Sequence, residues 1–466
     1  MAKKYTEDQK FEIMLKEQEE FRNNLDVYKK GLELLKLTLS DINNSLRKKG
    51  LGIVYTTDRI KSENSFLEKV HRKIDSSEPF NTKSAHDIIG FRVILRNLED
   101  VRAYVNSIHN NPLIKVVNEK NYIDDPKESG YKSIHLIVEI PVDTIMGKKK
   151  VHAEIQVRTA LMDVFAREEH KLNYKGDCSA ESREELFELS LALTNCESSF
   201  ENALKGTMVK PEEPKKDEVE KFNKVLPYFE KAQKKLQLKI DDLKDNYPNR
   251  DDIAFTSDRI KPVTSIKRKL KKRKLSYTPF NIRTKITDVV GFKIVVMTRK
   301  ELDSLLTYIK KSKIFDIIDE KNYVKTPKES GYKGYHLKVK ENVLGPNGQV
   351  EIVSEIQLQT MLMAAWSANE DVFYLDKNLN NNSIKYNLSV VSKNLYTVAE
   401  RLDRLKEKEL ELKKSKLIAL KNKAYMNRCN HERNFIKELE EYKKNKKNPS
   451  KGSLKLVNVK EKKGED

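Results

Sequence analysis

The chain has 466 residues, too many for one ordinary hydrophobic core, so we expect two or three domains. Lysine and arginine total 91 against 71 acidic residues. The resulting net charge of +20 favours polyanionic partners such as nucleotides, nucleic acid or an acidic membrane surface, or simply reflects lysine-rich solvated faces. Three scattered cysteines argue against disulfides and zinc, and no segment resembles a signal peptide or membrane span, so we expect a cytoplasmic protein without a membrane partner.

In chain order, helical periodicity comes first and strand-like runs follow, and this order occurs twice. A final stretch has a helical pattern nearly saturated with lysine and glutamate, and the tail is rich in Lys, Gly and Pro, which predicts disorder. The predicted segments are an N-terminal helical extension (1–50), a first domain (51–208), a linker (209–217), a helical preface (218–250), a second domain (251–376), a C-terminal helical region (377–442) and the tail (443–466).

Three blocks of sequence are repeated in register. DRIKSE at 58–63 returns as DRIKPV 200 residues later. EKNYIDDPKESGYKSIHL at 119–136 returns as EKNYVKTPKESGYKGYHL, and EIQVRT at 154–159 returns as EIQLQT, both after 201 residues. Colinear blocks at a constant spacing indicate an internal duplication, and we call the two halves copy one and copy two.

A pair of carboxylates recurs in both copies. Asp87 and Asp288 open strand-like runs, whereas Glu154 and Glu355 fall on the polar face of a later strand. Two acids on neighbouring strands suit Mg²⁺, so we predict that Asp87 and Glu154 hold the ion or that one accepts a proton from a hydroxyl. The structural alternative is a strand-end turn at Asp87 and an ion pair between Glu154 and Arg158.

His86 beside Asp87 is reminiscent of a metal-dependent phosphohydrolase of the HD type. Copy two has Thr287 at the position of His86, which argues against such an enzyme.

A basic run follows the DRIK turn in each copy. Side chains at four of its positions fall on one helical face, and cations with a hydroxyl at a helix start form a cradle for polyphosphate. A solvated basic helix is the alternative. The predicted phosphate-binding residues are Arg59, Lys61, Ser65, Lys69 and Arg72, with Arg259, Lys261, Ser265 and Lys269 in copy two.

The PKESGY segment predicts a tight loop that delivers a tyrosine, Tyr131 or Tyr332, to the start of a strand. An aromatic ring beside a lysine is a natural platform for a purine base, and a buried hairpin tyrosine is the alternative.

These motifs resemble the RelA/SpoT synthetase family, especially the small alarmone synthetases that lack a hydrolase domain. The resemblance covers roughly residues 40–208 and, more weakly, 245–376, through RxKxxxSxxxK, DxxGxR, PKxxGYxSxH, ExQxRT and EHKxxYK. It implies a nucleotidyltransferase-like α/β (α+β) fold with a mixed sheet flanked by helices, present as two tandem copies. It also implies transfer of pyrophosphate from ATP to the 3′-hydroxyl of GDP or GTP, with release of AMP.

The resemblance implies a role for each predicted site residue. The basic run would grip the ATP phosphates, and Asp87 would hold Mg²⁺ while Glu154 helps and activates the hydroxyl. Tyr131 would stack on the acceptor base, with Tyr332 as its copy-two counterpart. Residues near the acceptor phosphates and ribose would be Lys120, Lys127 and His135, with His336 in copy two.

Copy two departs from the family pattern. It has Lys293, Gly334, Gln359 and Asp371 where copy one has Arg92, Ser133, Arg158 and His170. Losing cations in a phosphate-handling cleft lowers turnover, so we expect copy one to be the main catalyst. Copy two is then a slow synthetase or, as we favour slightly, a nucleotide-binding regulatory copy.

Other interpretations stay open at this level. Both copies have Ser129 or Ser330 where the family commonly has Asn, which puts guanine recognition in question. The KRKLKKRK run at 267–274 and the positive charge suit a toxic pyrophosphokinase acting on tRNA 3′ ends. A non-enzymatic nucleotide sensor or nucleic-acid-binding protein is a further alternative, and the terminal helices could support a homo-oligomer.

Overall fold

The computed structural model describes residues 5–76, 85–145, 147–172, 178–204, 213–345, 348–373 and 382–447. The chain divides into one unit up to Leu405 and a second from Lys406 onward. Across the described residues, no helix combines the length and the apolar character needed to cross a membrane.

Copy one begins with two helices, α1 (Glu7–Asn23) and α2 (Leu25–Lys48). Thr6 starts α1 with a capping box, because its side chain accepts from the backbone N–H of Gln9 while the Gln9 side chain accepts from Thr6 N–H. The remaining elements are β1 (Ile53–Ile60), α3 (Glu63–Asp75), β2 (Ile89–Leu95), α4 (Leu98–His109), β3 (Lys115–Asn121), β4 (Ile134–Thr144), β5 (Gly147–Thr159), α5 (Ala160–Leu172) and α6 (Ala180–Leu204).

Copy two repeats this order. Its elements are α7 (Lys216–Asn223), α8 (Leu226–Asn246), the short 3₁₀ helix η3 (Arg250–Asp252), β6 (Ile253–Ile260), α9 (Val263–Lys272), α10 (Pro279–Lys285), β7 (Val290–Val296), α11 (Arg299–Ser312), β8 (Ile317–Asn322), β9 (Tyr335–Gly345), β10 (Gly348–Thr360), α12 (Met361–Phe373) and α13 (Asn382–Lys447).

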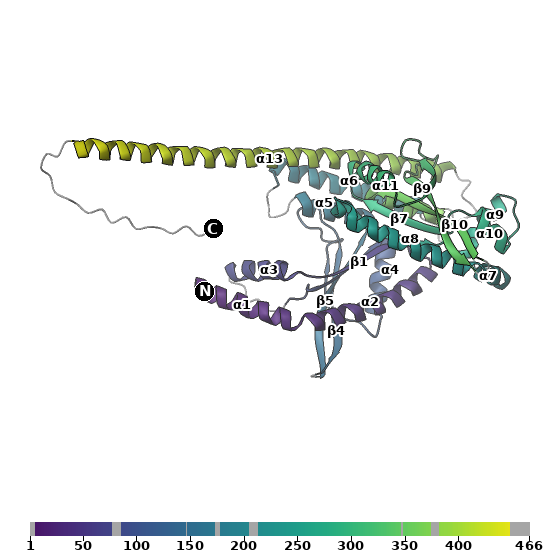
Figure 1. Ribbon diagram of the computed structural model, residues 1–466. Coiled ribbons are helices and arrows are strands. Elements are labelled where there is room, and N and C mark those ends of the chain that lie inside the picture. Colours follow the sequence, from purple (N-terminus) through teal and green to yellow (C-terminus); the bar gives the residue numbers. More distant parts are fainter. Residues whose placement is uncertain are drawn as a thin grey trace. The chain divides into compact units, whose positions relative to one another are not determined.

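Each copy forms one five-stranded mixed sheet. The strand orders are β1-β2-β5-β4-β3 and β6-β7-β10-β9-β8, so the two sheets have the same topology. In each sheet the second and third strands run parallel and the other neighbours antiparallel. This confirms the predicted fold class, a mixed sheet flanked by helices and present twice (Figure 1).

The apolar face of the first sheet packs against α2. Leu35 and Leu39 of α2 are buried in the same cluster as Ala153 and Ile155 of β5. Burial alternates along β5 because successive side chains point to opposite faces, as the sequence pattern predicts. The opposite face therefore carries the partly exposed polar residues, including Glu154.

The two copies share a hydrophobic cluster in which equivalent positions meet. Tyr55 of β1 stacks on Phe255 of β6, with ring centroids 3.9 Å apart and planes 14° from parallel. Helices α5 and α12, which are also equivalent, contact each other. The Asn369 side chain donates to the Arg96 carbonyl at 3.3 Å. The contact is therefore built like the interface of a symmetric dimer, in which the same patch meets itself.

Helix α13 covers residues 382–442 of the C-terminal helical region predicted at 377–442, and residues 377–381 lie outside the described residues. It continues to Lys447, five residues into the predicted tail, and residues 448–466 of that tail lie outside the described residues. The predicted linker likewise falls partly outside them, and α7 begins at Lys216.

Candidate active site

Sheet pairing brings the two predicted acids of copy one to the same face. Asp87 lies two residues before β2, and Glu154 stands in the middle of β5 opposite Gly90 of β2. The two carboxylates also interact electrostatically, since Asp87 counteracts part of the lowering of the Glu154 pKa. In copy two, Glu355 lies opposite Gly291 in the same way.

Two lysines of the basic run hold the aspartate. Lys61 Nζ lies 2.6 Å from Asp87 Oδ2, and Lys69 Nζ lies 2.8 Å from Asp87 Oδ1. Burial would raise the pKa of Asp87, but hydrogen bonds from the two lysines outweigh it and the pKa is lowered. Copy two has the same arrangement, with Lys261 and Lys269 at 3.0 and 2.8 Å from Asp288.

The glutamate is held by a histidine and an amide. His135 Nδ1 lies 3.0 Å from Glu154 Oε1, and Gln156 Nε2 donates to Glu154 Oε2 at 2.8 Å. Burial raises the pKa of Glu154, yet these two partners bring it below its usual value, so the carboxylate is ionised near neutral pH. Tyr131 extends this series of hydrogen-bonded side chains, because its hydroxyl lies 2.9 Å from His135 Nε2.

Copy two has the same series of hydrogen-bonded side chains, a tyrosine, a histidine, a glutamate and a glutamine. His336 Nδ1 lies 3.1 Å from Glu355 Oε1, Gln357 donates to Glu355 at 2.8 Å, and the Tyr332 hydroxyl lies 2.6 Å from His336 Nε2. The pKa of Glu355 is lowered to about 2, because His336 and Gln357 outweigh the effect of burial.

The predicted base platform is more enclosed than its sequence suggests. Tyr131 is buried, and Lys127 lies over its ring at 4.6 Å and over that of Tyr122 at 4.9 Å. Gly130 shapes the loop, because its φ of +84° and its closeness to Ser190 leave no room for a side chain. The partly exposed Tyr122 shares Lys127 with Tyr131 and was not predicted, although its position in the repeated EKNY block was a usable signal.

A buried ion cluster lies behind the polar face of copy one. Arg158 pairs with Asp163 at 3.0 Å and not with Glu154, so the predicted alternative ion pair does not form. Asp163 also pairs with Arg167 at 2.7 Å and accepts from the Tyr55 hydroxyl. Arg158 and Arg92 both donate to Gln156 Oε1, at 3.3 and 3.0 Å. Sequence reasoning missed this ion cluster, whose signal was an acid inside the apolar run ALMDVFA.

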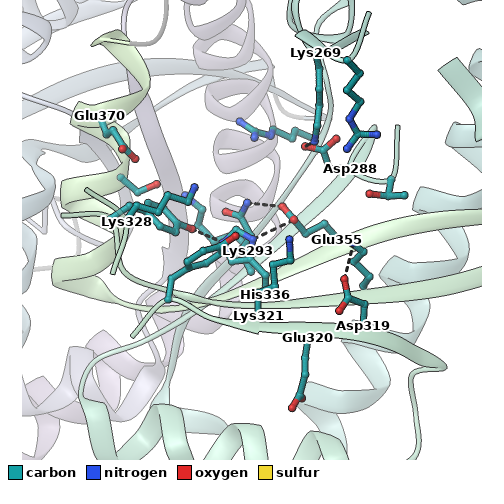
Figure 2. Close-up of a pocket in the computed structure, with 18 residues that line it drawn as sticks. Lys269, Asp288, Lys293, Asp319, Glu320, Lys321, Lys328, His336, Glu355 and Glu370 are labelled. Atoms are coloured by element: carbon teal, nitrogen blue, oxygen red, sulfur yellow. Dashed lines mark hydrogen bonds and ion pairs between the residues drawn. The ribbon is translucent and has the colours of Figure 1, made fainter. Parts of the chain in front are cut away.

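Copy two lacks the ion cluster and has a roomier cleft. Its equivalent residues are Phe255, Gln359, Ala364 and Ala368. The cleft beside Glu355 has a volume of about 300 Å³, against about 50 Å³ beside Glu154. Figure 2 shows Lys269 and Asp288 on one side of Glu355 and His336, with Lys328 and Glu370 on the other.

Other predicted residues of copy one make contacts of a different kind. Arg72 is exposed and donates to the Glu68 carbonyl of its own helix at 3.4 Å. Lys120 is exposed on β3, where it pairs in register with His135 of β4. Ser65 Oγ is 2.9 Å from Ser62 Oγ, the N-cap of α3. Arg59 does line the cleft beside Glu154.

The basic run of copy two contributes more residues to its cleft than the basic run of copy one. Arg259 and Lys269 line the cleft beside Glu355. Arg273, a later residue of the same basic run, lines it as well.

The acids of each copy are suited to share one divalent cation with a ligand. The described residues contain no group of three or more His, Cys, Asp or Glu arranged to hold a metal. One carboxylate oxygen, Asp288 Oδ1, is buried without a hydrogen-bond partner among them. Carboxylate oxygens are hard ligands of the kind that Mg²⁺ prefers, and one of them here has no hydrogen-bond partner among the described residues. The acid pair therefore fits Mg²⁺ with nucleotide phosphates supplying the other oxygen ligands.

Comparison with known proteins identifies the repeated domain. The model of the region found in RelA / SpoT proteins matches residues 58–179 and again 258–378. Two Bacillus subtilis proteins are similar to the chain. The GTP pyrophosphokinase YwaC is 37% identical over 160 residues, covering 34% of this chain and 76% of YwaC. The GTP pyrophosphokinase YjbM is 35% identical over 150 residues, covering 32% and 70%.

Solved structures of B. subtilis proteins are similar to the chain as well. Small alarmone synthetase 2 has 33% identity and a TM-score of 0.37, covering 40% of this chain and 98% of its own. Small alarmone synthetase 1 bound to its product pppGpp has 30% identity and a TM-score of 0.37, covering 39% and 95%. The assignment rests on the two family-model matches, which together span more than half of the sequence. The chain belongs to the RelA/SpoT family and carries the family's domain twice.

Proposed function

We propose that this chain is a (p)ppGpp synthetase that transfers pyrophosphate from ATP to the 3′-hydroxyl of GDP or GTP. The observation that carries the proposal is the ionised glutamate beside a lysine-held aspartate, a histidine and a tyrosine, built identically in both copies. The similar proteins named GTP pyrophosphokinases support it.

The chemistry needs one proton acceptor and charge neutralisation. The acceptor 3′-oxygen forms a bond to the β-phosphorus of ATP, the bond from that phosphorus to the α-phosphate oxygen breaks, and AMP leaves. Glu154 takes the hydroxyl proton, and its ionised state suits that role. Lys61 and Lys69 turn from Asp87 to the phosphates, where their charge offsets that of the transferred group.

Mg²⁺ is part of the proposal. Asp87 and Glu154 would hold it together with the ATP phosphates, and it would neutralise phosphate charge when bound. The unpartnered Asp288 oxygen supports an equivalent cation position in copy two. Activity should then disappear with EDTA and return when Mg²⁺ is added in excess.

The two copies are proposed to differ in rate. In copy one, Arg92 and Arg158 reach Gln156, and Gln156 in turn holds Glu154, so cationic side chains support the glutamate. Copy two has Lys293 and Gln359 at those positions but keeps the acids and an open cleft. We infer that both copies bind nucleotides and that copy one turns over faster.

The deciding experiment uses ATP labelled at the γ-phosphate, with GDP, GTP or tRNA offered as acceptors in parallel. Labelled guanosine product supports the proposal, whereas label in tRNA alone or in no product refutes it. Glu154→Gln is expected to lower the rate by roughly 100-fold or more. The matched Glu355→Gln variant should lower it far less, and an equal loss would contradict the assigned difference between copies.

A further inference from the structure

A second cavity in copy one lies on the far side of the loop that delivers Tyr131. It has a volume of about 240 Å³ and is separate from the cleft beside Glu154, since the two share no lining residue. Its walls come from α4, the loop after β3, α5 and α6. The volume corresponds to about eight water molecules at about 30 Å³ each, enough for a compact organic molecule.

The cavity combines an apolar wall with charged groups. Leu161, Phe165 and Leu193 are buried side chains of the apolar wall. Two cations, Arg102 and Lys132, line the same space. Asp124 also lines it and accepts a hydrogen bond from the Asn121 side chain at 2.7 Å. An apolar wall with a few polar groups is the usual composition of a small-molecule site.

Glu197 is a buried acid in the wall of this cavity. Its side chain is only 4% exposed, and Oε2 accepts a hydrogen bond from the Thr159 hydroxyl at 2.7 Å. Oε1 is buried and has no hydrogen-bond partner among the described residues. Burial raises the pKa of Glu197 to about 8, so near neutral pH the carboxyl is largely protonated. A neutral carboxyl in the wall does not repel an anion in the cavity.

Copy two provides an internal comparison, because its equivalent space is filled. Gly331 contacts Ser392 as Gly130 contacts Ser190, which makes Tyr396 the counterpart of Thr194 and Ala399 that of Glu197. Lys333 lies 3.8 Å from the centre of the Tyr396 ring, whereas Lys132 donates to Thr194 at 2.9 Å. The remaining cavity is about 30 Å³. The open pocket is therefore a property of copy one alone among these two equivalent positions.

We propose that this cavity is a binding site for a small organic carboxylate with an apolar body. The carboxylate meets Lys132 and Arg102, and the body packs on the apolar wall. Gly130 and Lys132 flank Tyr131, so an occupied pocket fixes the loop that carries the acceptor platform. Binding stands independently of the proposed function, whereas its effect on catalysis rests on it.

Phenylacetate is a suitable probe, and neutral phenylacetamide of the same shape is its control. Titration of the full chain by ligand-observed NMR should give a dissociation constant on the order of 0.1–1 mM for phenylacetate and at least about tenfold weaker binding of the amide. Thr194→Tyr, which copies the residue found in copy two, should abolish binding. Lys132→Met should weaken it about tenfold, and the matched Lys333→Met should leave it unchanged.

Several results would overturn the proposal. No binding of phenylacetate at about 10 mM, equal binding of the amide, or undiminished binding by Lys132→Met would each do so. Lys132→Met keeps the test valid if Thr194→Tyr fails to fold. In the synthetase assay, phenylacetate should change the KM for the acceptor and not the KM for ATP. Binding that leaves the acceptor KM unchanged would refute the link to the Tyr131 loop.

Discussion

Replacing Asp163 by alanine tests the buried ion cluster of copy one. Asp163 is fully buried and Arg158 is 2% exposed, so the variant leaves a guanidinium inside the protein without its carboxylate. Removing one partner of a buried ion pair costs about 3–5 kcal/mol of unfolding free energy, because the remaining charge is desolvated and unpaired. The exposed Asp143→Ala is a matched control and should change stability by less than about 0.5 kcal/mol.

In copy two, uncharged residues occupy the positions equivalent to the ion cluster. The fourfold variant Tyr55→Phe, Arg158→Gln, Asp163→Ala and Arg167→Ala installs the copy-two residues in copy one. Replacing a whole buried ion cluster by neutral residues is often nearly neutral, so this variant should lose less than about 2 kcal/mol. Urea unfolding followed by circular dichroism measures both variants. The reasoning is refuted if the single variant is as stable as the fourfold one.

The pH dependence gives the same test a second readout. Burial raises the pKa of Asp163, but Arg158 and Arg167 outweigh it and lower the pKa below the usual 3.8. The stabilisation is therefore present above about pH 3.8 and is lost as the pH falls through the folded-state pKa. The difference between wild type and Asp163→Ala should shrink in acid.

Three further predictions concern single residues. Burial, and to a smaller extent Glu201, raise the pKa of Glu197 to about 8, above its unfolded value of 4.5, although Thr159 and Lys132 partly oppose the shift. The folded state therefore holds a proton that the unfolded state releases between these values, and stability falls as the pH rises across that window. This fall in unfolding free energy amounts to roughly 3 kcal/mol at pH 7, from the difference between the two pKa values, and Glu197→Gln should remove it. Urea unfolding of the variant with the same pH profile as wild type would contradict this prediction. Gly130→Ala should destabilise the protein by about 1–3 kcal/mol in thermal unfolding, because Gly130 has a positive φ and lies against Ser190. Gly147 also has a positive φ but no neighbour within 4 Å among the described residues, so Gly147→Ala measures the cost of the backbone conformation alone. Arg92→Lys, which copies Lys293, loses the hydrogen bond to Gln156 and should slow the synthetase reaction about tenfold; an unchanged kcat would show that this bond is not needed.

The sequence predicts the parts of the site that depend on strand periodicity. Glu154 and Gln156 share the polar face of β5, and the acid pair meets because β5 lies beside β2. Both follow from alternation and from the repeated blocks, since a strand fixes side-chain direction locally. The same reasoning placed Arg158 on that face but could not tell that it is buried.

The missed features depend on how helices pack on the sheet. Arg158 is the penultimate residue of β5, and its partner Asp163 lies on the next helix, α5, so their pairing depends on how that helix packs against the sheet. Tyr131 is buried because its loop packs on α6 at Ser190. Glu197 is an ordinary polar residue in the sequence and becomes buried only through the position of α6. Local pattern carries none of this information.

The stacking of Tyr55 on Phe255 has an evolutionary consequence. When two identical chains pair about an axis, a substitution at the axis appears on both sides at once, so each side must accept the change it imposes on the other. Covalent fusion removes that constraint, because each side is encoded separately. One side of this contact has a hydroxyl that donates to Asp163, while the other has neither the hydroxyl nor the acid. Duplication within one gene thus gives an enzyme two halves that can specialise without losing their fit.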